Sequence, residues 1–185
     1  TELIEYYKGI FTILSSCASR QLEEVTFRRT VIPVQELLDA AGKYFKKSMK
    51  NRSERIELEI EPMEAKVIGD VNQLRFLLEN LIDEALTVRE DGVIRLQARL
   101  DNEYIRFLFT DTRREKSVEE LNQLFYPNLA RMTSGEKGEL RGTEYLVCKQ
   151  IIRDHDEFAG RRGCRINAEP AEGSGFTVYF TIPRR

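Results

Sequence analysis

The sequence predicts a two-layer α/β fold, in which helices cover one face of a mixed, mostly antiparallel sheet. Its length of 185 residues suits a single domain, and 41% hydrophobic residues provide enough apolar surface for a core. Segments with apolar residues at three- and four-residue spacing alternate with segments in which every second residue is apolar. Helices and strands of this kind bury their apolar sides when they stack in two layers.

The composition excludes several classes of function. The 29 basic and 31 acidic residues leave a net charge of -2, whereas a dedicated nucleic-acid-binding domain is usually strongly basic. Cys17, Cys148 and Cys164 form no closely spaced pair, and there is a single histidine, so a zinc site is excluded. The longest uncharged run, between Lys8 and Arg20, is too short to span a membrane. We therefore expect no contact with nucleic acid or membrane, and a compartment that keeps thiols reduced.

Residues 1–29 are expected to form a helix followed by a linker. Apolar residues such as Leu3 and Ile10 recur at helical spacing among charged ones. Nothing before Pro33 can bury this apolar stripe, so we expect it to pair with a helix of a second chain or of an upstream segment. A helix folded back on its own domain is the alternative. The chain begins with Thr1, and we expect it to be a piece of a longer polypeptide.

From residue 30 onward, the spacing of apolar residues predicts the elements. Helices are expected where apolar residues recur every third or fourth position, and strands where they alternate. Asp101 and Asn102 provide turn chemistry for a hairpin, and Pro33 is expected to open a helix. The predicted helices are 34–45, 71–88, 118–125 and 145–155, the predicted strands are 56–60, 93–100, 104–109, 164–168 and 176–182, and 126–141 is a predicted loop.

Four patches of sequence carry most of the functional information. They are residues 73–85, QLRFLLENLIDEA; 109–112, FTDT; 142–152, GTEYLVCKQII; and 172–183, EGSGFTVYFTIP. In this order and on these elements, they resemble the nucleotide-binding module of sensor histidine kinases, a branch of the ATPase superfamily shared with gyrase, Hsp90 and MutL. The resemblance covers residues 30–185 and implies a Bergerat-type two-layer sandwich. Residues 1–29 resemble the second helix of the dimerisation hairpin that feeds into that module.

The resemblance implies a site for ATP and Mg²⁺. Asp111 would accept a hydrogen bond from the adenine amino group, Glu84 would stand in the place of the Mg²⁺-binding asparagine, and Asn80 would support it. A carboxylate such as Glu84 is a hard oxygen ligand that can hold Mg²⁺. Gly142 would mark the phosphate grip at a helix N-terminus, and Thr177 would contribute from the last patch.

Departures from the family pattern predict a degenerate ATP site. Arg113 and Glu115 stand where the family has glycines that let the backbone lie close to the base. Glu144 replaces a glycine at the phosphate grip, and the helix dipole would stabilise its carboxylate where a phosphate is needed. Glu84 adds a further negative charge beside the triphosphate, which asparagine does not. The three carboxylates of Glu84, Glu115 and Glu144 therefore point to a weakened site for a tetra-anion.

The basic residues around this site have two interpretations. Either they compensate the charge of the phosphates or they are ordinary solvated loop charges. They are Arg113, Arg114, Arg131, Lys137 and Arg141.

The single histidine, His155, is expected to be structural. It lies at the end of a predicted helix, where the family commonly has a histidine before a glycine turn. The phosphoacceptor histidine of a sensor kinase lies on the first helix of the dimerisation hairpin. The resemblance therefore places the acceptor outside this chain.

The first functional hypothesis is the nucleotide module of a bacterial two-component sensor kinase. It would be cytoplasmic, alone or as part of a membrane-anchored sensor, and homodimeric through residues 1–29. It would present the γ-phosphate of ATP to an upstream histidine-bearing helix and serve a response regulator. The alternative is a pseudokinase that relays conformation or binds a response regulator without using ATP. A third hypothesis, an anti-sigma-type kinase, is disfavoured by the helix in residues 1–29.

Overall fold

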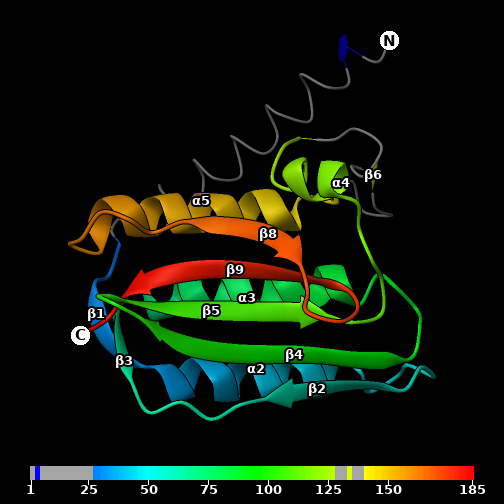
Figure 1. The fold of residues 1–185 in the computed structure, drawn as a ribbon, viewed down its shortest axis with the longest axis horizontal. Coiled ribbons are helices and arrows are strands. Elements are labelled where there is room, and N and C mark those ends of the chain that lie inside the picture. The colour runs from blue at the N-terminus through cyan, green and yellow to red at the C-terminus, as the bar shows by residue number, and fades with distance from the viewer. Residues whose placement is uncertain (1–2, 5–26, 128–132, 135–139) are drawn as a thin grey trace.

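The computed structural model describes residues 3–4, 27–127, 133–134 and 140–185. Residues 30–122 and 144–183 contain the elements of the predicted two-layer α/β sandwich (Figure 1). The main sheet has five strands in the order β2-β4-β5-β9-β8. The β2–β4 pair is parallel, and the other three pairings are antiparallel. The strands are β2 (Ile56–Ile60), β4 (Gly92–Asp101), β5 (Tyr104–Asp111), β8 (Ile166–Pro170) and β9 (Phe176–Pro183).

Three long helices form the second layer, on one face of the sheet (Figure 1). They are α2 (Val34–Ser48), α3 (Val71–Ala85) and α5 (Glu144–Phe158), and a short helix α4 (Val118–Asn122) follows β5. Helix α3 packs between α2 and α5 and is the central helix of this layer. Helix α3 begins after Asp70 because the side chain of Asp70 caps its N-terminus, where it accepts hydrogen bonds from the N–H groups of Asn72 and Gln73.

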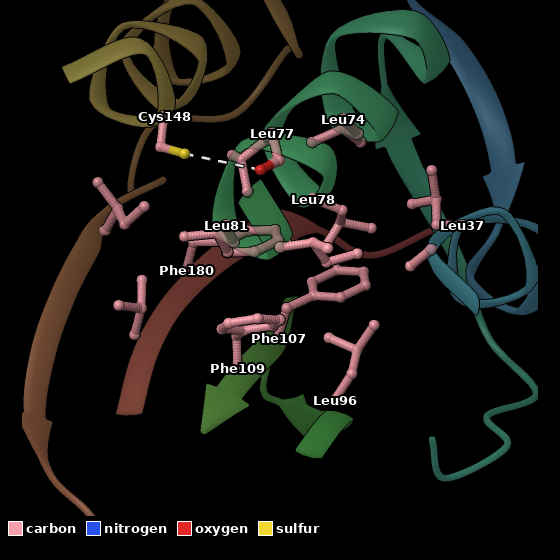
Figure 2. Packing of buried hydrophobic residues seen from close by; sticks show 14 of the residues in the cluster. Leu37, Leu74, Leu77, Leu78, Leu81, Leu96, Phe107, Phe109, Cys148 and Phe180 are labelled. Carbon is pink, nitrogen blue, oxygen red and sulfur yellow. Dashed lines mark hydrogen bonds between the residues drawn. The ribbon is translucent and has the colours of Figure 1, made fainter. Parts of the chain in front are cut away.

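The core lies between these layers (Figure 2). Phe107 of β5 and Phe180 of β9 stack with ring centroids 4.8 Å apart and planes 5° from parallel. The thiol of Cys148 on α5 donates to the carbonyl oxygen of Leu77 on α3 at 3.6 Å, which ties the two helices together. Side chains from both layers are therefore fixed against one another, and the strand ends that they support are fixed with them.

A second, two-stranded sheet was not predicted from the sequence. Strand β1 (Thr30–Pro33) pairs antiparallel with β3 (Lys66–Gly69), in register from Thr30 opposite Gly69 to Pro33 opposite Lys66. Each strand has four residues, too few to produce a clear alternation. Pro33 ends β1 and precedes α2, so the helix opens there as predicted.

Some boundaries differ from those expected. Helix α3 ends at Ala85 rather than 88, because the N–H groups of Thr87 and Val88 bond only three residues back, to Glu84 and Ala85. The 101–104 hairpin forms, and Asn102 supplies its positive φ of 54°. Within the predicted loop 126–141, β6 (Thr133–Ser134) pairs with β7 (Leu140–Arg141).

Most of the predicted 1–29 helix lies outside the described residues, except for residues 3–4 and 27–29. Among the residues that are described, no helix is both long enough and apolar enough to cross a membrane.

Candidate functional site

Asp111 ends strand β5, with its side chain 5% exposed. It pairs across the sheet with Phe176, the first residue of β9. Gly175, immediately before Phe176, approaches so closely that a Cβ atom there would overlap the carbonyl oxygen of Asp111. With its φ of +92°, this position requires glycine. The backbone on both sides of Asp111 is thus held rigidly, and its carboxylate has a fixed direction.

The guanidinium of Arg113 occupies both oxygens of the Asp111 carboxylate. Nε donates to Oδ1 at 2.9 Å and Nη2 donates to Oδ2 at 2.9 Å, while the backbone N–H of Arg113 also donates to Oδ1 at 3.0 Å. The Arg113 side chain is 1% exposed. This two-pronged arrangement is the strongest geometry that an arginine and a carboxylate can form.

The remaining donors of Arg113 bind carbonyl oxygens at the end of helix α3 and in the loop that follows it. Nη1 donates to the carbonyl oxygens of Val88 at 2.9 Å and Glu90 at 3.0 Å, and Nη2 donates to the carbonyl oxygen of Ala85. A positive charge is favourable here, because the C-terminus of a helix carries unpaired carbonyl groups and partial negative charge. Gly92 leaves room for the side chain, since a Cβ there would lie 2.5 Å from Cγ of Arg113.

Glu84 and Glu144, two of the carboxylates that the resemblance assigns to the metal and phosphate region, act electrostatically on neighbouring groups. Burial raises the pKa of Asp83 on α3, and the charge of Glu144 on α5 raises it further, although a hydrogen bond from Tyr44 at 2.7 Å opposes the shift. Burial likewise raises the pKa of the Cys148 thiol, with added contributions from Glu144 and Glu84. The charge of Glu144 therefore acts on both Asp83 and Cys148, and the charge of Glu84 acts on Cys148.

Glu144 is the first residue of helix α5, and Gly142, with φ of +82°, stands two residues before it. The Oε2 atom of Glu144 is buried and has no hydrogen-bond partner within the described part of the chain. The helix N-terminus itself favours this negative charge. A carboxylate therefore already stands at the helix start where a phosphate would be gripped.

The structure brings together some of the predicted site residues and separates others. Asn80 is buried, and its side-chain amide donates to the carbonyl oxygen of Phe76 at 2.7 Å, within its own helix. The hydroxyl of Thr177 is paired with that of Thr110 at 2.8 Å. Because side chains alternate along a strand, Thr110 and Thr177 lie on the opposite face of the sheet from Asp111. Thr177 therefore does not lie beside Asp111. The residue of β9 directly opposite Asp111 is Phe176.

Of the other basic residues singled out in the sequence, Arg114 is the one whose side chain is described, and it pairs with Glu90 rather than with Asp111. Arg114 is exposed and lies 3.5 Å from Glu90, and Glu115 is also exposed. Arg131 and Lys137 lie outside the described residues, as does the side chain of Arg141. The interpretation of Arg114 as an ordinary surface charge fits this arrangement, whereas Arg113 has a role that sequence reasoning missed. The signal available was an arginine two positions after a buried strand-terminal aspartate, which needs a partner.

The residues present fit ATP poorly. The carboxylate expected to read adenine already has both oxygens bonded to Arg113. The helix start expected to grip phosphates carries the buried oxygen of Glu144. No group of three or more Asp, Glu, His or Cys side chains suited to hold a metal ion occurs among the described residues. Whether Glu84 binds Mg²⁺ stays a prediction.

Comparison with known families identifies the fold. The family model described as histidine kinase-, DNA gyrase B-, and HSP90-like ATPase matches residues 69–185, which are more than half of the chain. The chain belongs to this ATPase family. Its resemblance to histidine-kinase nucleotide modules is thereby confirmed at the level of family and fold.

Individual relatives agree with this assignment. The sensor histidine kinase RcsC of Escherichia coli strain K12 is 27% identical over 116 residues, which are 62% of this chain and 12% of that protein. The chain therefore matches only about an eighth of its curated relative. The catalytic domain of histidine kinase ThkA has a TM-score of 0.65 at 21% identity, covering 85% of this chain and 97% of that one. A structure of ThkA in complex with the response regulator TrrA covers 100% of this chain and 52% of that one, with a TM-score of 0.65 at 19% identity.

Proposed function

We propose that this chain is a histidine-kinase ATPase module whose nucleotide site is closed by its own side chains, so that it does not bind ATP. It would act in two-component signalling as a pseudokinase that relays conformation or binds a response regulator. One observation carries this proposal: the buried guanidinium of Arg113 holds both oxygens of Asp111. The ATPase family and the fold are established, and the loss of ATP binding is the new element.

Adenine could reach Asp111 only after Arg113 had left. Breaking a buried ion pair by removing one partner typically costs about 3–5 kcal/mol. If the binding-competent state lies that far above the closed state, the apparent affinity for ATP falls by a factor between about a hundred and a few thousand. The departing side chain would also take its donors away from the carbonyl oxygens of Val88 and Glu90.

The phosphate side of the site supports the same conclusion. Glu144 places a carboxylate at the N-terminus of α5, and Glu84 places another at the end of α3. A triphosphate brought into this space would meet two like charges that the family pattern lacks. Repulsion between these partly buried like charges is stronger than in water, because the protein interior screens charge less than water does.

The assignment to two-component signalling rests on the relatives. RcsC is a sensor histidine kinase, and ThkA has been seen in complex with a response regulator. By analogy, we propose that a response regulator or an upstream histidine-bearing helix is the partner, that residues 1–29 form a homodimer contact, and that the module works in the cytoplasm of a bacterium. Comparing the mass of chain 1–185 with that of chain 30–185 by sedimentation tests the homodimer contact, which equal monomeric masses would refute.

The decisive experiment is thermal unfolding of chain 1–185 with and without millimolar Mg-ATP. A ligand present at a hundred times its Kd stabilises the folded state by about 2.7 kcal/mol. We expect no shift for the natural sequence. The triple variant Glu84→Asn, Arg113→Gly, Glu144→Gly should regain a shift, because it removes the guanidinium and both carboxylates.

A matched control replaces Arg113→Gly in the triple variant by Arg114→Gly. Arg114 is exposed and does not contact Asp111, so this control should remain unresponsive to Mg-ATP. A saturable stabilisation of the natural sequence by Mg-ATP would refute the proposal. A triple variant that folds but gives no shift would show that Arg113 and the two carboxylates are not what excludes ATP.

A further inference from the structure

The segment that precedes β1 is fastened to the module by an aromatic contact. The ring of Phe27 meets the ring of His155 edge to face, with centroids 4.7 Å apart and planes at 77°. It also lies 5.8 Å from the ring of Phe158, at the end of the same helix α5. Edge-to-face pairs at such distances are favourable beyond the apolar area that they bury. Phe27 thus covers a histidine that is 0% exposed.

His155 in turn joins two helices. Its Nε2 accepts a hydrogen bond from the backbone N–H of Asp70 at 3.1 Å, and its Nδ1 lies 2.8 Å from the carbonyl oxygen of Ile151. Because Nε2 accepts, Nδ1 carries the hydrogen and the ring is neutral. Gly69 makes this approach possible, since a Cβ there would lie 2.8 Å from Nε2. The last turn of α5 is therefore tied to the residue that caps α3.

Asp70 completes the connection back to the preceding segment. Its Oδ1 accepts from the N–H groups of Asn72 and Gln73 in the first turn of α3, at 3.0 and 3.2 Å. Its Oδ2 accepts from the backbone N–H of Arg28 at 2.9 Å. One carboxylate therefore serves both the helix and the segment before β1. Asp70 is also the charged group that acts on His155, where it favours the protonated ring.

A third contact involves the side chain of Arg29. A Cβ atom on Gly160, just beyond the end of α5, would lie 2.7 Å from Nη1 of Arg29 and 2.8 Å from Cζ. The guanidinium therefore rests directly on the glycine backbone. Each of the three consecutive residues Phe27, Arg28 and Arg29 touches the ends of α3 or α5.

We propose that residues 27–29 form a latch that couples the preceding chain to the module, holding the first turn of α3 and the last turn of α5 together while it is engaged. A displacement of the chain before Phe27 pulls the ring off His155 and the N–H of Arg28 off Asp70. Water then reaches His155, and the first turn of α3 loosens. Helix α3 is the same helix whose far end is capped by Arg113. The latch does not depend on whether the module binds ATP.

The test uses the single histidine as a reporter. In untagged chain 1–185, His155 is the one histidine in the sequence, so its ring signals in an NMR pH titration are unambiguous. Burial lowers the pKa of His155 to about 4 in the latched state. We expect Phe27→Ala to raise that pKa by at least about one unit, toward the ordinary value near 6.5. The control Phe76→Ala, the same change on the outer part of α3, should leave it unchanged.

A second pair of variants tests the backbone contact without touching the aromatic rings. Arg28→Pro removes the N–H that donates to Asp70, whereas Arg28→Ala keeps it. Amide exchange at Asn72 and Gln73 should become at least about tenfold faster in Arg28→Pro and stay unchanged in Arg28→Ala. The latch is refuted if the pKa of His155 in Phe27→Ala equals that of the natural sequence. Equal exchange rates in the two Arg28 variants would refute it independently, even if Phe27→Ala does not fold.

Discussion

Acidification should weaken the fold through His155 well before the carboxylates titrate. Burial lowers the pKa of His155 to about 4, against an ordinary value of 6.5 in the unfolded chain. Above pH 6.5 the ring is neutral in both states, and its contribution to stability is complete. Between pH 6.5 and 4 the unfolded chain binds a proton that the folded chain does not bind. Unfolding therefore becomes easier by about 1.4 kcal/mol for each pH unit.

The magnitude follows from the width of that window. From pH 6.5 to pH 5 the loss is about 2 kcal/mol, and over the full window it approaches about 3 kcal/mol. Carboxylates add to acid denaturation only at lower pH. For example, hydrogen bonds from Arg99 and Gln97 lower the pKa of Glu61, so its contribution is lost below its ordinary pKa of 4.5. The range from pH 6.5 to 5 thus isolates the histidine.

The assay is urea unfolding of chain 1–185 at pH 7, 6 and 5. The slope of the free energy of unfolding against urea concentration should be the same at each pH if unfolding is two-state throughout. The comparison is His155→Gln, which does not titrate in this range. We expect the natural sequence to lose stability with falling pH and the variant to remain flat, although less stable at pH 7. Parallel pH profiles for the two proteins would refute the assignment, because the lost stability would then come from another group.

Two further predictions concern the closed nucleotide site. Arg113→Ala should lower the free energy of unfolding by about 3–5 kcal/mol, because it leaves the buried carboxylate of Asp111 uncompensated. The control Arg114→Ala should change the free energy of unfolding by less than about 1 kcal/mol. Equal effects of the two variants in urea unfolding would contradict the role given to Arg113. Gly175→Ala should cost about 2–5 kcal/mol, since its Cβ would overlap Asp111 at a positive φ. Gly173→Ala is the matched control, because Gly173 has a similar positive φ but a Cβ there would meet nothing within 4 Å. This control should lower the free energy of unfolding by about 1–2 kcal/mol. If calorimetry finds the two variants equally stable, the close approach at Gly175 is unimportant.

Much of the fold could be predicted from the sequence, because its long elements have clear periodicity. Helices α2, α3 and α5 and the β4–β5 hairpin lie within a few residues of their predicted positions. The β1–β3 pair could not be predicted in this way. Its two strands are four residues long and separated by α2 and β2, so only tertiary packing brings them together.

The candidate site shows a sharper limit. The patch around Asp111 and the added bulk of Arg113 were visible in the sequence, and both lie at the end of β5. The direction of the guanidinium was not visible, because it depends on the carbonyl oxygens of Ala85 and Val88, 28 and 25 positions away. Thr177 shows the opposite case, in which a motif residue lies on the far face of the sheet and bonds to Thr110.

The position of β9 has a consequence for how the chain folds as it is synthesised. β9 is the last of the five strands in sequence, but it lies between β5 and β8 in the sheet. Until it has emerged from the ribosome, β8 has no neighbour in the sheet and the long edge of β5 is unpaired. Phe107 also lacks Phe180, on which it stacks in the finished protein. A nascent chain stopped before Phe176 therefore exposes an apolar strand edge, which is the form most prone to aggregation and to capture by chaperones.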